Sequence, residues 1–146
     1  MELEIDYAVA SKYRDYHDFY SRNLRIFKSF VRAFENFFKK EKFQNSGIEV
    51  DEDVKDRATI KFCSKKYQIS LFLDPANLNS AAIVLAKINK DQLHKIGEVI
   101  IDHAENIIFP GDQRVLLKDN YEFNNALLNF FISAITKNAD QETAAS

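Results

Sequence analysis

The residues best suited to catalysis lie close together near position 105. Asp102, His103 and Glu105 are near neighbours, and Asp112 follows a Pro-Gly pair. Carboxylates and an imidazole can coordinate a divalent metal ion or exchange protons with a substrate. On a strand, however, Asp102 and His103 point to opposite faces, so one ion cannot contact both without a bend in the backbone. The alternative is a polar strand end that enters a turn, and the sequence leaves both interpretations open.

Short motifs of well-known enzyme classes are absent from the sequence. It contains no phosphate-binding glycine loop, no dinucleotide-binding glycine pattern, no Cys-x-x-Cys pair, no His-Glu-x-x-His and no EF-hand loop. Only three glycines occur in 146 residues, although phosphate loops and tight active-site turns often depend on this residue. These observations favour a non-enzymatic protein, for which we expect no metal ion and no cofactor.

Basic residues are concentrated in the segment 11–42. This segment contains nine Lys or Arg residues and four Asp or Glu residues, a net charge of +5, whereas the whole chain has a net charge of −2. A basic helix face can contact phosphate groups or an acidic partner. The residues that would make these contacts are Arg22, Arg25, Lys28 and Arg32. The alternative is an ordinary solvated face opposite an apolar core stripe.

The same segment has the apolar period of a long α-helix. Two mostly aromatic series recur every seven positions, which places each series on one helix face. They are Tyr13, Tyr20, Phe27 and Phe34, and Tyr16, Asn23, Phe30 and Phe37. A helix over 11–42 would be about 48 Å long, whereas a compact domain of this size has a diameter of roughly 38 Å. We therefore expect the helix either to bend near Ser21–Asn23 or to reach a partner.

After this helix the apolar period changes to two, which is typical of β-strands. The predicted strands cover 48–50, 57–64, 67–73, 81–88 and 113–117. The segment 90–109 is ambiguous, because Leu93 and Ile96 fit a helical face whereas the β-branched run 99–101 favours a strand. We predict a strand over 96–102.

A second helix is predicted over 121–137, and apolar residues surround nearly its whole circumference. A thin uncharged stripe contains Asn125, Asn129 and Ser133. A helix that packs on a sheet buries one side, and each large apolar side chain left in water forgoes roughly 1.5–3 kcal/mol of burial. We therefore predict a protein interface formed by Leu128, Phe131, Ile132, Ile135, Asn125 and Asn129. The alternative is a helix sunk between the sheet and the first helix.

Strands grouped between two helices favour an α+β fold. We predict an antiparallel sheet of four or five strands, with the long N-terminal helix and the apolar C-terminal helix packed on one of its faces. The length of 146 residues is usual for one domain. We assign 1–137 to a single domain and 138–146 to a flexible C-terminal tail.

The function predicted from these features is protein binding. The first residues are acidic, the longest apolar run is too short to span a bilayer, and a single cysteine excludes an intrachain disulfide. We expect a cytoplasmic, non-enzymatic protein-binding module (an adaptor, an inhibitor or immunity protein, or a small chaperone) that acts through apolar helical surfaces. Its partner would be another protein or a second copy of itself, with no membrane contact. One alternative is a nucleic-acid-binding protein that uses the basic helix face, and the other is a small metal-dependent hydrolase.

Overall fold

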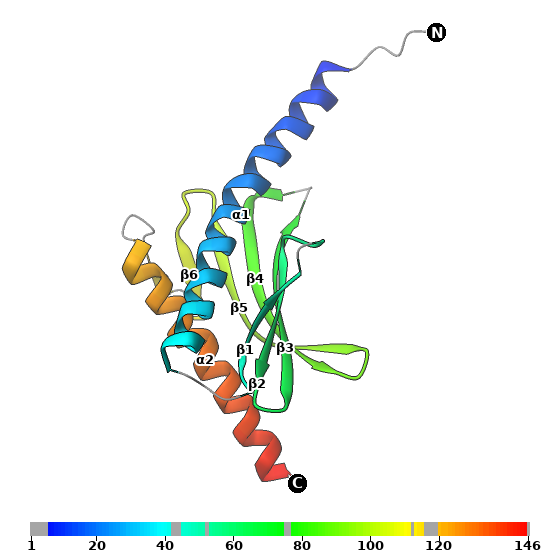
Figure 1. Ribbon diagram of the computed structural model, residues 1–146. Coiled ribbons are helices and arrows are strands. Elements are labelled where there is room, and N and C mark those ends of the chain that lie inside the picture. Colours follow the sequence, from blue (N-terminus) through cyan, green and yellow to red (C-terminus); the bar gives the residue numbers. More distant parts are fainter. Residues whose placement is uncertain are drawn as a thin grey trace.

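In the computed structural model, the described residues form two α-helices and seven β-strands (Figure 1). In chain order these are α1 (Tyr7–Glu41), β1 (Gly47–Val50), β2 (Arg57–Phe62), β3 (Lys65–Asp74), β4 (Asn77–Asn89), β5 (Gln92–Asp102), β6 (Ile107–Phe109), β7 (Gln113–Val115) and α2 (Asn120–Ala145). The structure describes residues 6–41, 45–51, 53–74, 77–111, 113–115 and 120–145, without the side chains of 77–79, 113–115, 120–124 and 142–145. The predicted α+β class is confirmed.

The strands form one antiparallel sheet in which each strand pairs with its neighbour in the sequence, so β1 and β7 are the edges. The central strands β3, β4 and β5 have 10, 13 and 11 residues. In the described residues the sheet has seven strands, more than the four or five predicted for it. Six of them correspond to strand segments predicted from the sequence, and the remaining one, β6, has three residues and is too short to show a period of its own. It is defined by its pairing with β5, in which Ile107 lies opposite Ile101 and Ile108 opposite Ile100.

The ambiguous segment 90–109 contains β5, so the prediction of a strand there is confirmed. Val99 and Ile101 pair with Ile83 and Ala81 of β4, and all four side chains are buried. β5 begins before the predicted boundary because it forms a long hairpin with β4. Cross-strand pairing therefore decided between two local conformations that the sequence pattern alone allowed.

Gly97 of β5 allows α2 to pack closely on the sheet. A Cβ atom at this position would lie 3.5 Å from the ring of Phe130 and 3.6 Å from the methyl group of Ala134. These distances correspond to ordinary van der Waals contact, so the space above Gly97 is already filled by the helix. A larger side chain at this position would push α2 away from β5.

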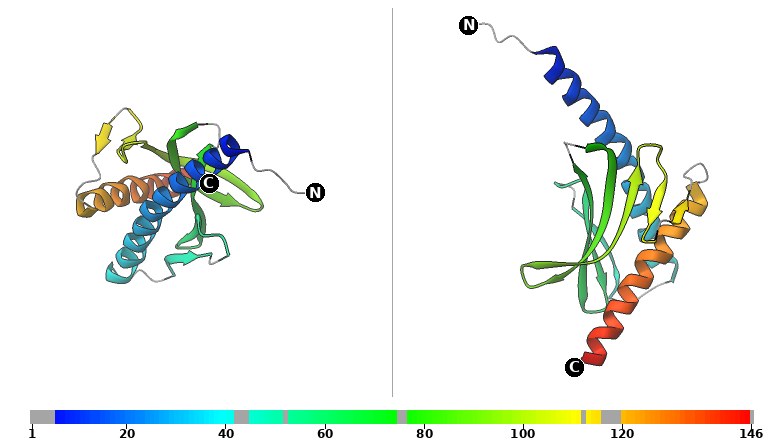
Figure 2. Two further views of the ribbon diagram at one scale, coloured as in Figure 1. Left: turned by 90° about the horizontal axis from the view of Figure 1, so that it is seen from above. Right: turned by 180° about the vertical axis from the view of Figure 1, so that it is seen from behind.

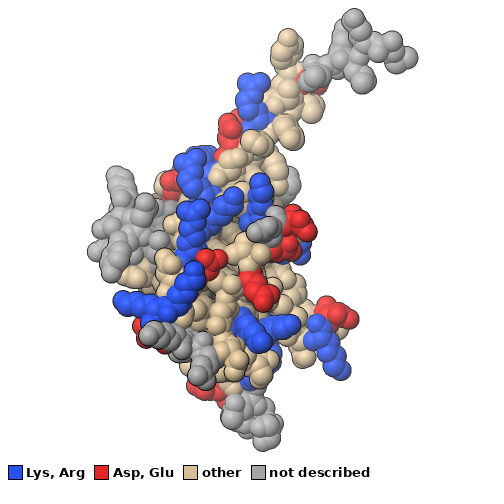
Figure 3. Space-filling view, viewed as in Figure 1, with Lys and Arg blue, Asp and Glu red and all other residues tan. Residues whose placement is uncertain are grey.

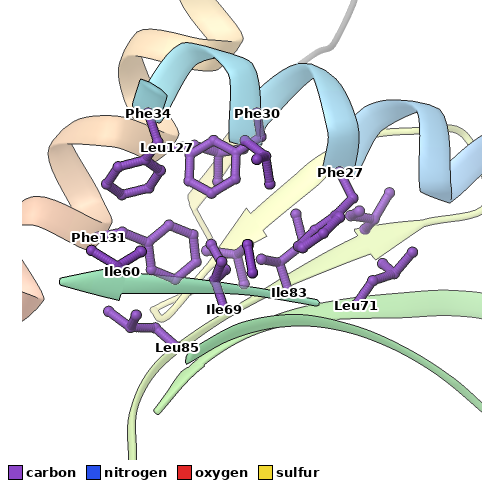
Figure 4. Close-up of a cluster of buried hydrophobic side chains, with 14 of the residues drawn as sticks. Phe27, Phe30, Phe34, Ile60, Ile69, Leu71, Ile83, Leu85, Leu127 and Phe131 are labelled. Carbon is purple, nitrogen blue, oxygen red and sulfur yellow. The ribbon is translucent and has the colours of Figure 1, made fainter. Parts of the chain in front are cut away.

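Both helices pack against the same face of the sheet, as predicted (Figure 2). α1 contacts β1, β3 and β4, α2 contacts β5, and the two helices contact each other. Between them and the sheet lies a core of helix aromatics and strand aliphatics (Figure 4). The rings of Phe30 and Phe131, one from each helix, have centroids 5.3 Å apart. The core therefore joins both helices to the inner face of the strands.

α2 continues to Ala145, through most of the segment that we assigned to a flexible tail. The predicted end at position 137 was too early for two physical reasons. The segment after it contains no proline or glycine, so nothing in its sequence stops a helix. In addition, the hydroxyl group of Tyr67 on β3 donates a hydrogen bond to Oδ1 of Asn138 at 3.4 Å. This contact to the sheet lies beyond the predicted helix end.

Candidate functional site

The N-terminal turns of α1 project beyond the sheet (Figure 1). Phe19 is the first buried residue of the helix, so the twelve residues Tyr7–Asp18 contain none that is buried. Twelve residues correspond to about 18 Å of helix. The sequence predicted that this helix would either bend near Ser21–Asn23 or reach a partner, because a straight helix of this length overhangs a compact domain. The helix runs without interruption from Tyr7 to Glu41 and extends past the sheet.

The apolar stripe of α1 continues from the core onto these projecting turns. Tyr13 lies two heptads before Phe27, and Val9 lies three heptads before Phe30, so all four share one helix face. Phe27 and Phe30 are buried, whereas 71% of Tyr13 and 63% of Val9 are exposed. The ring of His17 stacks on Tyr13 with the centroids 6.4 Å apart, which leaves most of the tyrosine uncovered. The part of the stripe that lies above the sheet is therefore an exposed apolar surface.

Tyr20 lies at the base of the projecting turns, where the stripe enters the body of the protein. Burial, followed by the negative charge of Asp56 and the neighbouring Tyr16, raises the pKa of its phenol. The hydroxyl group is therefore neutral at physiological pH and able to donate a hydrogen bond. Asp56 immediately precedes β2, so the loop between β1 and β2 lies near this base.

The structure corrects the predicted interface on α2. Phe131 and Ile135 are buried in the core, so a partner chain cannot contact them. Leu128 and Ile132 are partly buried and pack against the same core. The physical reason is that α2 contacts both the sheet and α1, so its large apolar side chains pack into the core between them. This arrangement matches the alternative of a helix sunk between the sheet and the first helix.

The uncharged stripe of α2 is exposed. Asn125 and Asn129 are exposed, as the predicted interface requires, but the large apolar residues beside them are not. Asn129 and Ser133 line an open groove of about 770 Å³ whose other wall includes Lys95 and Ile96 of β5. Six of its nine lining residues are polar, but Ile96, Phe130 and Ala134 add an apolar part to the lining. The groove therefore offers a partner both hydrogen-bonding groups and apolar surface.

The four basic residues predicted to bind phosphate or an acidic partner do not form one site. Basic side chains form a band along α1 (Figure 3). Within it, Arg22 and Arg25 line a hollow together with Asp15 and Asp18, and the Arg22 guanidinium lies 5.9 Å from the centre of the Phe19 ring. Neighbouring carboxylates reduce the positive potential of this hollow.

Lys28 and Arg32 line a different groove, between α1 and the segment 50–57, with a volume of about 400 Å³. Two further cations, Lys55 and Arg57, face the same space from the other wall. The sequence pattern did not identify these two residues, because they lie more than twenty positions from Arg32. The residues that line this groove are Phe27, Lys28, Val31, Arg32, Glu35, Val50, Asp51, Lys55 and Arg57.

Asp102 has a structural role in the turn between β5 and β6. Its Oδ1 atom accepts hydrogen bonds from the backbone N–H groups of Ala104 and Asn106, both at 2.9 Å. Its Oδ2 atom accepts one from the Asn106 side-chain amide at 3.2 Å. His103 and Glu105 are exposed, and Asp112 lies outside the described residues. Within the part of the chain that the structure describes, no three His, Cys, Asp or Glu residues are close enough to hold a metal ion.

A second apolar surface, on the outer face of the sheet, was not predicted. Phe72, Ala82, Ile100 and Ile108 lie opposite one another across β3 to β6 and point away from the helices. Phe72 is exposed and the other three are partly exposed. The signal in the sequence is that β4 and β5 carry apolar residues at successive positions, which is typical of strands covered on both faces.

Comparison with known proteins identifies no relative of this chain. It matches no family model, no curated protein and no solved structure. In the described residues, neither helix has a stretch long and apolar enough to cross a membrane. The geometry therefore defines the chain as an α+β protein with a projecting, partly apolar helix and a basic groove beside it.

Proposed function

We propose that this is a non-enzymatic, cytoplasmic protein-binding module that holds a partner chain along the projecting turns of α1. The observation that carries the proposal is the exposure of Val9 and Tyr13, which lie on the same helix face as the buried core residues Phe27 and Phe30. The predicted interface thus moves from α2 to the start of α1. Adaptor, inhibitor or immunity protein, and small chaperone all remain within this class.

The energetics of the stripe favour a partner. A large apolar side chain gains roughly 1.5–3 kcal/mol when it leaves water, and two such residues are largely exposed on adjacent turns. About 18 Å of projecting helix is long enough for a partner helix to lie alongside it, with the heptad spacing of a coiled coil. The partner is therefore a helix with an apolar face, from another protein or from a second copy of this chain.

The alternatives receive less support from the same residues. A nucleic-acid-binding face needs a continuous row of cations, but Asp15 and Asp18 lie beside Arg22 and Arg25. A metal-dependent hydrolase needs free ligands, but the Asp102 carboxylate already accepts three hydrogen bonds within its own turn. No specific observation favours either function over protein binding.

The proposal is tested by a charge placed on the stripe and a matched charge placed opposite it. Tyr13→Asp should abolish association, because burying an unpaired carboxylate at an interface costs several kcal/mol. Ser11→Asp adds the same charge two residues away on the other side of the helix and should leave association unchanged. Association is measured by sedimentation of the purified protein over a concentration series, alone and with any partner captured from cell extract.

Both substitutions fall on exposed positions of the projecting turns, so both variants should unfold at the temperature of the unmodified protein. This control separates loss of binding from loss of folding. The proposal would be contradicted if the protein stayed monomeric at every concentration and captured no stoichiometric partner. Equal association of the two variants would contradict it as well.

A further inference from the structure

The groove between α1 and the segment 50–57 brings together cations from two distant parts of the chain. Lys28 and Arg32 lie one turn apart on α1, Lys55 lies in the loop before β2, and Arg57 is the first residue of β2. All four side chains are exposed to the groove or its rim. Tertiary packing therefore places four positive charges around one hollow of about 400 Å³.

In the described part of the chain, carboxylates balance these cations only in part. Among the described residues, none of the four takes part in an ion pair. The groove also contains two carboxylates, Glu35 and Asp51, so its lining has an excess of two positive charges. Oδ1 of Asp51 already accepts a hydrogen bond from the backbone N–H of Asp53 at 3.0 Å. An anion in the groove would relieve the repulsion among the cations.

The floor of the groove is apolar. Phe27 and Val31 form it from α1, and Val50 at the end of β1 is 44% exposed beside them. Small-molecule sites typically have volumes of about 300–1,000 Å³, an apolar lining and a few charged groups that fix the orientation of the ligand. This composition differs from a phosphate-backbone surface, which needs cations but no apolar floor.

We propose that the groove binds a small amphiphilic anion, with an apolar chain or ring that carries one carboxylate or phosphate group. The guanidinium groups of Arg32 and Arg57 bind the anionic group, since their planar forks match the oxygens of a carboxylate or phosphate. Lys28 and Lys55 add positive charge around it. The apolar part of the ligand lies on Val31 and Val50. This site is separate from the projecting turns of α1 and does not depend on the protein-binding function.

The test uses decyl phosphate, at concentrations at which it does not form micelles, and inorganic phosphate as the matched probe without an apolar part. Calorimetric titration should show saturable binding of one decyl phosphate per chain and much weaker binding of inorganic phosphate. The methyl signals of Val31 and Val50 should shift in NMR spectra during the same titration. Increasing salt should weaken binding, because the anion is held by exposed cations.

Two double variants locate the anionic group. Arg32→Gln with Arg57→Gln should weaken decyl phosphate binding by at least about tenfold, because two charged hydrogen-bond donors are lost. Arg22→Gln with Arg25→Gln removes the same charge from the neighbouring hollow and should change binding by less than about twofold. Val50→Thr, nearly equal in shape, should weaken binding of decyl phosphate but not of inorganic phosphate. Thermal unfolding of each variant shows whether the fold is retained.

Several results would overturn the proposal. One is the absence of saturable decyl phosphate binding, and another is an equal loss of affinity in the two arginine pairs. A further experiment uses vesicles of phosphatidylcholine that contain phosphatidylglycerol. It distinguishes binding of a single molecule from binding to a lipid surface. Capture of the protein on these vesicles without saturable binding of monomeric decyl phosphate would show that the groove is not a site for one ligand molecule.

Discussion

Individual residues of this protein hold the turns and the helix start in place. The Asp102 carboxylate organises the turn between β5 and β6, and the Asp6 carboxylate accepts a hydrogen bond from the backbone N–H of Ala8 at 2.9 Å. Burial by itself raises the pKa of the Asp102 carboxyl, but the hydrogen bonds from Asn106 and Ala104, together with nearby His103, bring this pKa below its ordinary value. The charged form of Asp102 is thus favoured in the folded state.

This pKa shift predicts a contribution to the acid sensitivity of the fold. A carboxyl whose pKa is lower in the folded than in the unfolded chain stabilises the fold above the unfolded value of about 3.9, and this contribution is lost as the pH falls through the folded pKa. Asp102→Asn keeps an acceptor oxygen for the turn but cannot ionise, so its stability should depend less steeply on pH below about 4. Asp102→Ala loses the acceptor and should cost about 1 kcal/mol at pH 7.

Urea unfolding at a series of pH values from 6 to 3 measures both effects. The unmodified protein and the two variants are compared by their free energies of unfolding at each pH. If the unmodified protein and Asp102→Asn lose stability with the same slope in acid, the carboxylate has no such role. If Asp102→Ala is as stable as Asp102→Asn at pH 7, the hydrogen bonds of the turn contribute little.

At the scale of elements, α1 combines a packed part with an uncovered part. From Phe19 onward its apolar face is buried, whereas Tyr7–Asp18 extends past the sheet without a buried residue. Helical segments shorter than about 12–15 residues are marginally stable in water without tertiary contacts. The projecting turns are therefore stabilised chiefly by continuity with the packed helix and by the Asp6 cap.

We predict that backbone amides of residues 9–16 exchange with deuterium at least about 100-fold faster than those of residues 24–36, because local opening costs less free energy where no packing is lost. Mass spectrometry of peptides from the exchanged protein measures the difference. Asp6→Ala should further speed exchange in the first turns and leave residues 24–36 unchanged. Binding of a partner along the stripe should slow exchange in 9–16, and equal protection of both segments in the free protein would contradict the prediction.

At the scale of the whole molecule, one core couples both helices to the sheet. Phe131 lies at the centre of this core, with its ring 5.3 Å from that of Phe30 and 5.2 Å from that of Phe130, measured between centroids. The outer face of the same sheet carries the partly exposed row Phe72, Ala82, Ile100 and Ile108. The helices thus cover the inner face, whereas the outer face leaves Phe72 exposed and the other three residues of the row partly exposed.

The position of Phe131 predicts a large effect on stability. Phe131→Ala should lower the free energy of unfolding by about 3–5 kcal/mol, because the substitution leaves a cavity among two helices and the sheet. Asn129→Ala, two residues away on the exposed stripe, should change it by no more than about 0.5 kcal/mol. Both values come from urea unfolding followed by circular dichroism. Equal small losses in the two variants would show that α2 is not held in a common core.

The sequence by itself determined the elements and one consequence of their length. A seven-residue period and alternating apolar residues depend on local geometry, so the first helix and most strands could be predicted within a few residues. The expectation that a straight first helix would overhang a compact domain needed only its residue count and the rise per residue. A three-residue strand such as β6 has no period, and it could not be predicted because its pairing with β5 defines it.

The tertiary structure decided which surfaces are available to a ligand or partner. Periodicity identifies apolar faces but not what covers them, so the interface was predicted at Phe131, and Tyr13 could not be distinguished from the core residues of its stripe. Packing of α2 against both α1 and the sheet buries the first, and the extension of α1 past the sheet exposes the second. In the same way, only the folding of the segment 50–57 against α1 brings Arg57 next to Arg32 in one groove, because their proximity depends on contacts between residues far apart in the chain.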